Sequence, residues 1–554
     1  MVNSVTLVIA AFFLAVGVSP AAAEPVSTII GLSALLFNTG LFASVGAAAA
    51  FGGAVVTGGI LIGANYALAK TVPNVGGLDN VGPAVINTPE ARGAVRASAG
   101  PQRRVYGRIA TSGQWLAYHD GNPPYQYLML GLARGRIHAV RAVTINNNRI
   151  VFSNGTPFGQ ILPPLAIDGQ QYANGLIACF RQGLPDQAID PLFAAAFPPS
   201  GNDFIFDGSG INFTNLPTSF RQRGIATASF RAHFGTTQEQ FDARWGRVPY
   251  IDPQIEIDGH PVFDPRDPSQ DIDDESTYKF YYNGRENGRN PSLIQANWLT
   301  QPFGGRLRTD QLRLDELAAA ADYDDEIVHD RDGYPRPRHR ADGVVLLNDN
   351  PRHVTEALLT ANRAWIVQSR GRVGWVPSIP RDPEITLTEK DFLAGFDYRD
   401  DVAKRDTFNR ITSRFTPPEK DYSEDDGPVY DRADVRDEED NGELLAGQIR
   451  TPFTTDQRTV QWLQQQFFEE NRLGRGLDIP ALPNTPRILK RKIGAVVRVT
   501  HRWYPEINGI YQLRKDGISS DWSSVSWSLR EYDKSISSVD RSQDQQDFQV
   551  AEAA

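Results

Sequence analysis

The stretch from Asp258 to Phe415 decides the fold, because its turn residues and helix starts follow one another in a distinctive order. It opens with Gly259-His260-Pro261-Val262-Phe263-Asp264-Pro265-Arg266, followed by Asn290-Pro291-Ser292-Leu293, Trp298-Leu299-Thr300 and Pro302-Phe303-Gly304-Gly305. It closes with Asn350-Pro351, Trp365-Ile366-Val367, Thr386-Leu387-Thr388 and Phe408-Asn409-Arg410-Ile411. A residue that precedes proline is driven to extended geometry, so each of these X-Pro steps marks a turn or a helix boundary.

In this order and spacing, the phrases resemble the lambda-type tip attachment protein J family, the tail hub of long-tailed phages. The resemblance covers roughly residues 100 to 535 and is strongest between residues 258 and 415. We call the positions that carry it the signature residues: Gly259, Val262, Asp264, Pro265, Arg266, Asn290, Pro291, Leu299, Pro351, Trp365, Leu387, Thr388, Phe408 and Asn409. For any one of them a purely local role, such as a turn, is the simpler interpretation.

The resemblance implies an α+β, β-rich fold with β-barrel-like hub domains and inserted helices. It implies a homotrimer at the distal end of the tail of a virion. The partners it implies are the distal tail ring protein, the tape measure protein and other tail tip proteins. DNA would pass through the lumen without specific binding. The expected function is to close the tail tube and to open it for DNA ejection during host entry. Larger family members continue into fibre-like domains, so we expect other proteins to carry receptor recognition.

Composition sets limits on the class of protein. A chain of 554 residues exceeds one core and predicts two to four domains. The 48 Gly and 37 Pro favour many short strands and turns. A net charge of −10 argues against a nucleic-acid surface, which needs clustered basic residues. The single cysteine, Cys179, excludes an intrachain disulfide and lies in the apolar run 176–180, so we expect a buried small hydrophobic residue.

Residues 1–70 form a hydrophobic N-terminal segment whose only charges are Glu24 and Lys70. An apolar run followed by Ala21-Ala22-Ala23 resembles a signal peptide, although no basic residue precedes the run. The second uncharged stretch is long enough for a helical hairpin in a bilayer. Three interpretations stay open: an export signal with a membrane anchor, a device that enters the host membrane, and a plug among symmetric subunits. The first leads to an alternative identity, an exported membrane-anchored bacterial envelope protein.

Periodicity predicts the organisation of the rest. Residues 71–100 are expected to be a linker, 101–257 a first β-rich hub domain and 258–365 an α-helical hub region. Residues 366–533 are expected to form a second β-rich hub domain, in which the acidic tract 421–443 would be a solvated loop or insertion. The Ser/Gln/Asp-rich end, 534–554, is expected to be disordered.

Three helices are predicted within these regions. The first has Leu314, Leu317, Ala318 and Ala321 on one face, and the second has Val354, Ala357, Leu358, Ala361 and Trp365. Asn350 would cap the second helix, with Pro351 at its first position. Thr455-Asp456 would cap the third. A hairpin is expected where residues 365–367 face 373–376 across Arg370-Gly371.

No residue set assembles into an active site, so we predict no catalytic, cofactor-binding or metal-binding residues and no enzyme. The eight histidines include no zincin motif, and the chain has no phosphate-binding glycine loop or nucleophile elbow. A tail-associated wall-degrading enzyme is the rival in that class. The acidic cluster 322–326 ends a helix, where negative charge is unfavourable, so we expect it to pair with Arg336, Arg338 or Arg340.

Overall fold

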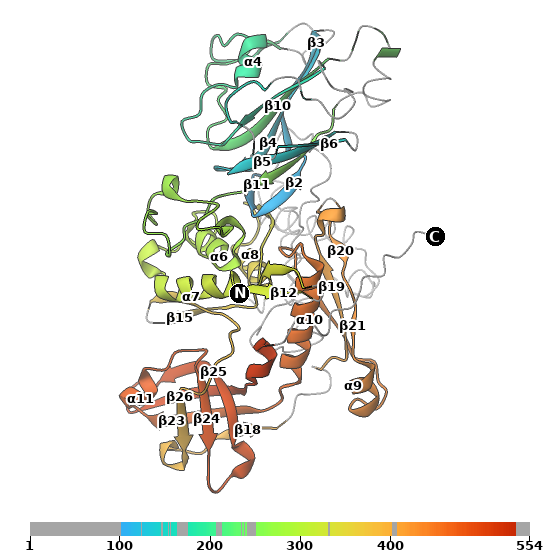
Figure 1. Ribbon diagram of the computed structural model, residues 1–554. Helices are drawn as coiled ribbons and strands as arrows, with labels where there is room; N and C mark the ends of the chain where they lie inside the picture. The colour runs from blue at the N-terminus through green and yellow to red at the C-terminus, as the bar shows by residue number, and fades with distance from the viewer. Residues whose placement is uncertain are drawn as a thin grey trace, which may run out of the picture. The chain divides into compact units, whose positions relative to one another are not determined.

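The computed structural model describes residues 101–538, except for short gaps at 123–124, 146–147, 153–154, 156, 163–164, 166–174, 207–212, 234, 236, 238, 241–250, 331–332, 370, 401–406 and 421. The hydrophobic segment 1–70, the linker 71–100 and the tail beyond residue 538 lie outside the described residues. Strands and helices both contribute, and the predicted α+β, β-rich class is confirmed (Figure 1). Each sheet of the described part has edge strands, so none of them closes on itself.

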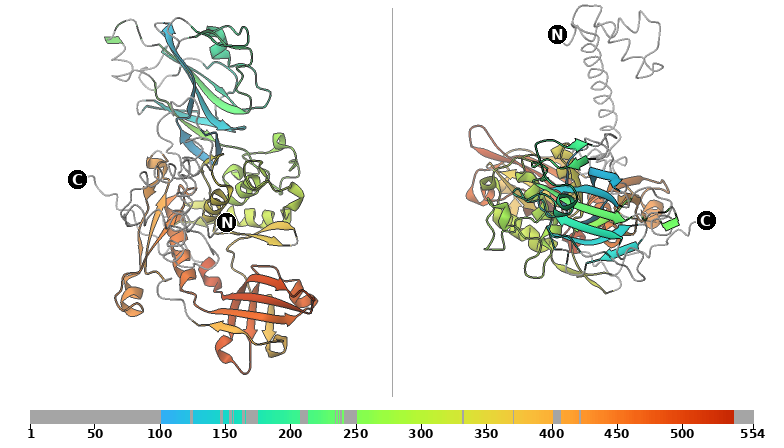
Figure 2. Two further views of the ribbon diagram at one scale, coloured as in Figure 1. Left: turned by 180° about the vertical axis from the view of Figure 1, so that it is seen from behind. Right: turned by 90° about the horizontal axis from the view of Figure 1, so that it is seen from above.

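Two four-stranded antiparallel sheets form a sandwich, drawn in blue to green in Figures 1 and 2. The first has the order β3 (Gln114–Asn122), β4 (Tyr125–Arg134), β10 (Ile225–His233) and β7 (Leu176–Arg181). The second has the order β2 (Arg108–Thr111), β11 (Gln254–Asp258), β5 (Ala139–Ile145) and β6 (Asn148–Val151).

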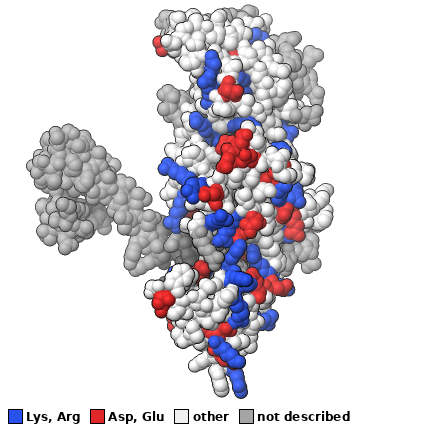
Figure 3. Space-filling model, turned by 90° about the vertical axis from the view of Figure 1, so that its left-hand side faces the viewer, with Lys and Arg blue, Asp and Glu red and all other residues white. Residues whose placement is uncertain are grey.

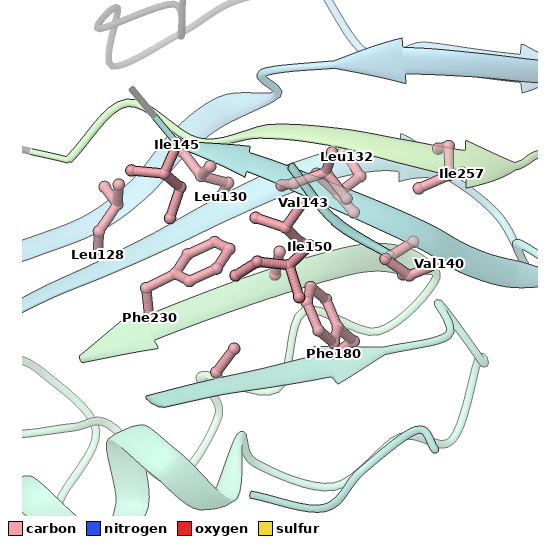
Figure 4. Packing of buried hydrophobic residues seen from close by; sticks show 14 of the residues in the cluster. Leu128, Leu130, Leu132, Val140, Val143, Ile145, Ile150, Phe180, Phe230 and Ile257 are labelled. Atoms are coloured by element: carbon pink, nitrogen blue, oxygen red, sulfur yellow. The ribbon is translucent and has the colours of Figure 1, made fainter. Parts of the chain in front are cut away.

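The core of the sandwich follows from strand alternation. Leu128, Leu130 and Leu132 of β4 share the face that packs into the core between the sheets (Figure 4). The residues between them face the other way, where Met129 packs on Phe193 of α4 (Pro191–Ala196). A small hairpin of β8 (Ile205–Phe206) and β9 (Phe213–Asn215) completes that side. Both faces of β4 are therefore buried. Cys179 is fully buried in β7, as expected.

A two-stranded ribbon contributes to two cores. In this ribbon β1 (Arg103–Tyr106) pairs with β14 (Gly343–Leu346). Val105 and Val344 belong to the sandwich core, whereas Tyr106 and Val345 belong to a second, helical core. Alternate residues of a strand point to opposite faces, so four residues of ribbon serve both cores at once.

The helical core contains α6 (Pro291–Thr300), α7 (Leu314–Asp324) and α8 (Pro351–Thr360). The Asn350 side chain accepts a hydrogen bond from Arg352 N at 3.0 Å, and Pro351 stands at the first helical position, so the predicted cap is confirmed. Helix α7 buries Leu317 and Ala321 of its predicted face. The short elements of this region are η1 (Glu275–Thr277), η2 (Asn287–Arg289), η3 (Thr309–Gln311) and the hairpin β12 (Ile327–His329) with β13 (Pro335–Pro337).

The predicted hairpin is confirmed as β15 (Trp365–Ser369) paired with β16 (Arg372–Val376). Gly371 takes φ of 73°, a left-handed conformation that glycine adopts without steric cost. Because α8 ends at Thr360, Trp365 belongs to β15 and not to the helical face on which its spacing placed it.

The acidic tract is more ordered than predicted. Strand β19 (Arg410–Phe415) pairs with β20 (Asp425–Asp426), β21 (Tyr430–Asp431) and β22 (Ala446–Arg450), and α9 (Ala433–Glu438) lies within the tract. Residues 425–426, 430–431 and 433–438 are therefore not a loop, although most described side chains of the tract are exposed or half-buried. The third helix is α10 (Gln457–Arg472), which Asp456 caps as predicted; η6 (Pro418–Lys420) is the remaining short element.

A six-stranded sheet and its connections form a third hydrophobic core, which includes Leu387, Leu477 and Trp527. Its order is β17 (Ile385–Thr388), β24 (Val496–Thr500), β25 (Gly509–Ile518), β26 (Ser524–Glu531), β23 (Gly476–Pro483) and β18 (Asp397–Arg399). Only the β17–β24 pair is parallel. The connections between these strands contain η4 (Glu389–Asp391), α11 (Pro486–Leu489) and η7 (Pro505–Ile507), and η8 (Lys534–Ser538) follows β26.

Candidate functional site

The strongest concentration of buried charge lies around two aspartates, Asp258 at the end of β11 and Asp342 just before β14. Both carboxylates are fully buried. We call the group around them the charged junction: Arg108, Arg141, Asp258, Tyr281, Glu286, Arg289, Asp342 and Thr455. Burial of a charge is costly unless it is paired and hydrogen-bonded, so the partners of these carboxylates decide whether the group can exist.

Asp258 is held by two arginines from neighbouring strands. Arg108 Nε and Arg141 Nε each donate to its carboxylate at 2.7 Å, and the Tyr281 hydroxyl donates at 3.0 Å. Burial alone would raise the pKa of Asp258, but the hydrogen bonds from the two guanidinium groups hold this pKa below its usual value. Asp258 is therefore ionised, and it fixes β2 and β5 to the end of β11.

Asp342 accepts hydrogen bonds from three places in the chain. Arg289 binds it in a bidentate manner, with Nε and Nη2 both at 2.7 Å. The backbone N–H of Arg108 donates at 2.7 Å and the Thr455 hydroxyl at 2.8 Å. Burial opposes ionisation, yet the Arg289 guanidinium lowers the pKa of Asp342. One carboxylate thus ties the sandwich strand β2, the turn η2 and the segment before α10 to the β1–β14 ribbon.

The close approach at this point depends on a glycine. Gly107 has φ of 70°, and a Cβ there would lie 2.3 Å from Asp342 Oδ1 and 2.4 Å from the Ala341 carbonyl oxygen. Its N–H donates to the Gly288 carbonyl at 3.0 Å. Any other residue would be strained in this backbone conformation and would also push Asp342 away from Arg108.

A second buried polar network holds the three helices of the helical core together. Asp324 at the end of α7 accepts from the Ser292 hydroxyl at 2.5 Å and from Asn362 Nδ2 at 3.1 Å. His339 Nδ1 lies 2.8 Å from the other Asp324 oxygen, and both side chains are fully buried. Gln295 extends the network by donating to the Leu358 carbonyl and to the Asn362 amide oxygen. Such a network fixes how the helices pack, because a shift of one helix would leave buried donors and acceptors without partners.

The first signature residues gather beside these networks. Gly259 lies against Val105, where a Cβ would come within 2.5 Å of the carbonyl oxygen. Val262 and Leu299 are buried in the helical core. Pro265 precedes Arg266, whose guanidinium pairs with the buried Asp264 at 2.8 Å and with Asp325 at 2.9 Å.

The next signature residues, Asn290, Pro291 and Pro351, lie at the starts of helices. The Asn290 side chain accepts from Leu293 N at 3.2 Å to cap α6, and its amide donates to the Ala321 carbonyl of α7 at 3.0 Å. Pro291 stands at the first position of α6, as Pro351 does in α8. Asn290 therefore both starts one helix and docks another, with its side-chain oxygen as acceptor and its amide as donor.

The remaining signature residues lie elsewhere. The Arg514 guanidinium lies 3.6 Å from the ring centroid of Trp365. Leu387 is buried in β17 and Thr388 N donates to Asp391 at 2.8 Å. Phe408 stacks on Phe467, and Asn409 is fully buried with its amide donating to Asp440 and to the Glu443 carbonyl. The signature residues are thus spread over three parts of the fold and do not form one site.

The predicted pairing of the acidic cluster is partly confirmed. Arg338 Nη2 pairs with Glu326 at 2.6 Å. Arg336 instead pairs with Asp330 and Asp456, and Arg340 pairs with Glu286. Asp322 and Asp325 are neutralised by Arg266, which sequence reasoning assigned to a turn.

No group of three or more His, Cys, Asp or Glu side chains among the described residues is placed to hold a metal ion. None of the helices built from those residues has the length and apolar character to cross a bilayer. On the face seen in Figure 3, Lys and Arg side chains are interspersed with Asp and Glu. That face offers no uniform basic stripe for a phosphate backbone.

Comparison with solved structures identifies the fold. A chain in the virion of a native gene transfer agent (GTA) particle matches with a TM-score of 0.54 at 14% identity, covering 87% of this chain and 97% of that chain. The 43 kDa tail protein of prophage MuSo2 from Shewanella oneidensis has 9% identity and a TM-score of 0.26, covering 79% of this chain and 98% of its own. Prophage tail protein gp18 from Listeria monocytogenes EGD-e has 9% identity and a TM-score of 0.23, covering 78% and 90%.

Only the first of these similarities is strong enough to use, and at 14% identity it shows the fold alone. The chain has the fold of a virion protein. No protein-family model matches the sequence, and no curated protein matches it.

Proposed function

We propose that this chain is a structural hub protein of a long-tailed phage tail tip, which closes the tail tube and opens for DNA ejection during host entry. The observation that carries the proposal is the fold shared with a virion chain along nearly the whole of both chains. The order of the signature residues adds the tip attachment protein J family as the particular relative.

The charged junction suits a mechanical role. Apolar cores resist separation but allow sliding, because hydrophobic contact has no direction. Paired buried charges act differently: losing one partner leaves an uncompensated charge, so only one arrangement is tolerated. Asp342 places such a constraint between the sandwich, the helical core and the segment before α10. A hub that transmits force between rings of subunits needs this kind of fixed geometry, and it needs no bond-making chemistry.

The proposal includes a homotrimer at the distal end of the tail, in contact with the distal tail ring protein, the tape measure protein and other tail tip proteins. An obligate trimer should bury upwards of ~2,000 Å² at each interface. The predicted domain division at about residues 257 and 365 belongs to the same proposal, as does an acidic conduit that lets DNA pass without adhering.

Imaging of particles tests the proposal directly. Tails from cells that express the chain with a C-terminal epitope tag should bind antibody at one end, and averaged images should show three copies there. A tagged variant of the distal tail ring protein gives a matched control for position. The proposal fails if the chain is absent from purified particles or if the purified protein is a monomer.

The hydrophobic segment 1–70, with Glu24 and Lys70 as its only charges, supports a second candidate, an exported membrane-anchored bacterial envelope protein. Mass spectrometry of the mature N-terminus separates the two, because cleavage after Ala23 together with recovery in the membrane fraction would favour export. Under the hub proposal we assign this segment to plugging the channel or entering the host envelope. Deletion of residues 1–69 should then leave tails that assemble but eject DNA poorly, whereas deletion of residues 541–554 serves as the control.

A further inference from the structure

The turn between β25 and β26 holds an unusual tryptophan. Trp522 has φ of 59°, the left-handed region in which bulky side chains are rare. The residue is also 68% exposed. Hairpin turns that need a left-handed residue at this place favour glycine or asparagine. A tryptophan at this position has two free-energy costs: strain in the left-handed backbone conformation, and exposure of the apolar indole surface to water.

Polar groups hold this turn in one conformation. Trp522 N donates to the Ser519 carbonyl at 3.0 Å, and Ser519 N donates to the Ser524 carbonyl at 3.0 Å. The Ser523 backbone N–H and hydroxyl both donate to Asp521, at 3.2 and 2.8 Å. Hydrogen bonds from Ser519 and Ser523 lower the pKa of Asp521 to about 2. The exposed indole is therefore presented by a fixed scaffold and is not a consequence of a loose loop.

The residues around Trp522 argue against a protein interface and against an anionic lipid surface as its binding partner. Ile518 is the other exposed apolar residue of the turn, and the rest are Ser519, Ser520, Asp521, Ser523 and Ser524. Two apolar side chains fall far short of the ~800 Å² per partner that a stable protein interface needs. The turn carries no Lys or Arg, and the Asp521 carboxylate would repel an anionic lipid surface.

A sugar ring fits this combination in size and chemistry. The axial C–H bonds of a pyranose carry slight positive charge and match the negative face of an indole. The hydroxyl groups around the ring can bond to carboxylate and serine oxygens, which the turn supplies on both sides of Trp522. Rigid aromatic anchors among adaptable Ser and Asn groups are also the pattern of evolved binding loops.

We propose that the tip of the β25–β26 hairpin, residues 518–524, binds a neutral saccharide of a cell surface, with the sugar ring stacked on Trp522. This goes beyond the hub proposal, which assigns receptor recognition to other proteins. The two stand apart experimentally, because particle position and trimer mass do not depend on Trp522.

Trp503 provides a matched control within the same sheet. It is 70% exposed, on the loop that follows β24, and its backbone is not in the left-handed region. The Arg502 guanidinium lies 5.0 Å from its ring centroid and occupies one side of the indole. The two tryptophans therefore match in exposed apolar surface and differ in backbone strain and in polar neighbours.

The full-length protein is applied to an array of purified bacterial surface polysaccharides and their neutral oligosaccharide fragments. We expect binding to at least one neutral glycan, reduced at least tenfold by Trp522→Asn and less than twofold by Trp503→Asn. Asparagine tolerates the left-handed backbone, so Trp522→Asn should also melt at the same temperature as wild type or higher. A residue kept for structure would instead lower the melting temperature.

Three results would overturn the proposal. One is the absence of any glycan binding above background, and another is equal binding by wild type and Trp522→Asn. The third is a loss confined to vesicles: if phosphatidylglycerol vesicles bind wild type and not Trp522→Asn, the tip recognises lipid and not sugar.

Discussion

The sandwich and the charged junction meet in one strand, yet they are stabilised by opposite means. Ile255 and Ile257 of β11 lie in the apolar core between the sheets, whereas Asp258, the next residue, holds two arginines. Dispersion and hydrophobic burial depend mainly on filling the core volume, so the sandwich should tolerate apolar substitutions that conserve this volume. The charged junction instead requires a negative charge at the positions of the Asp258 and Asp342 carboxylates. Size-conserving substitutions should therefore affect the two regions very differently.

The largest effect is expected at Asp342, where asparagine conserves the volume and removes the charge. Asp342→Asn removes the buried one of the two carboxylates that pair with Arg289, leaving only Glu286 at 3.0 Å, and places an amide donor opposite N–H groups. We expect a loss of about 3 kcal/mol in the free energy of unfolding, as for broken buried ion pairs. Calorimetry would measure this, and hydrogen exchange at the Arg108 amide would show whether the junction opens locally.

Thr455→Val is the matched control, because it removes one neutral donor from the same carboxylate. It should cost roughly 1 kcal/mol. If Asp342→Asn melts within a degree of wild type, the buried charge does not fix the geometry of the junction. The proposed difference between the junction and the sandwich would then be wrong.

Acidification should change the stability contributions of the two regions in opposite directions. The folded pKa of Asp342 is lowered by Arg289, so its stabilisation is present above the unfolded pKa of about 3.9 and is lost as pH falls through the folded value. Asp190, which caps α4 beside the sandwich, has its pKa raised by burial. Its ionised form is unfavourable, so wild type should gain stability as pH falls through that folded pKa.

Melting curves from pH 7 down to pH 3 test this. The stability of wild type relative to Asp342→Asn should fall below pH 4, whereas its stability relative to Asp190→Asn should rise on acidification. Shifts of the same sign for both pairs would contradict the assignment of the two carboxylates.

A smaller effect is expected in the sandwich core. Phe230 of β10 is fully buried and packs edge-on against Phe180 at 6.1 Å. Phe230→Leu replaces the aromatic ring with a smaller, branched apolar group. We expect a loss of about 1.5 kcal/mol, since the neighbouring Leu and Val side chains can partly close the gap. A loss larger than that of Asp342→Asn would show that packing, not charge, sets the geometry.

Local signals in the sequence predicted local structure well. Asn350-Pro351, Asp456 and the turn at Gly371 lie where predicted, because capping and turn chemistry depend on residues within a few positions of one another. The α+β, β-rich class was implied by the family resemblance that the signature residues carry, and it is confirmed. Trp365 was assigned to a helical face by spacing alone, although the helix had already ended five residues earlier.

Long-range pairings left no such signal. Arg108 and Asp342 are 234 residues apart, and no periodicity links them. Gly107 was the one available hint, since a glycine between two alternating strands suggests a close backbone approach. The short regular elements within the acidic tract were missed because no sequence pattern marks its pairings with β19 or the burial of Asp440. The spread of the signature residues over three regions could be seen only in the folded chain.

The smallest effect should come from an ion pair outside the buried networks. Asp322 is 58% exposed and pairs with Arg266 at 3.1 Å and Arg285 at 2.8 Å. Exposed pairs gain little, since water screens the charges and both side chains lose freedom. Asp322→Ala should therefore cost less than about 0.5 kcal/mol and should change nothing in hydrogen exchange at α6. Arg266 keeps its contacts with Asp264 and Asp325, so the turn before α6 stays in place. A cost near that of Asp342→Asn would mean that charge acts in this protein through its net field and not through buried geometry, and added salt would then weaken both variants alike.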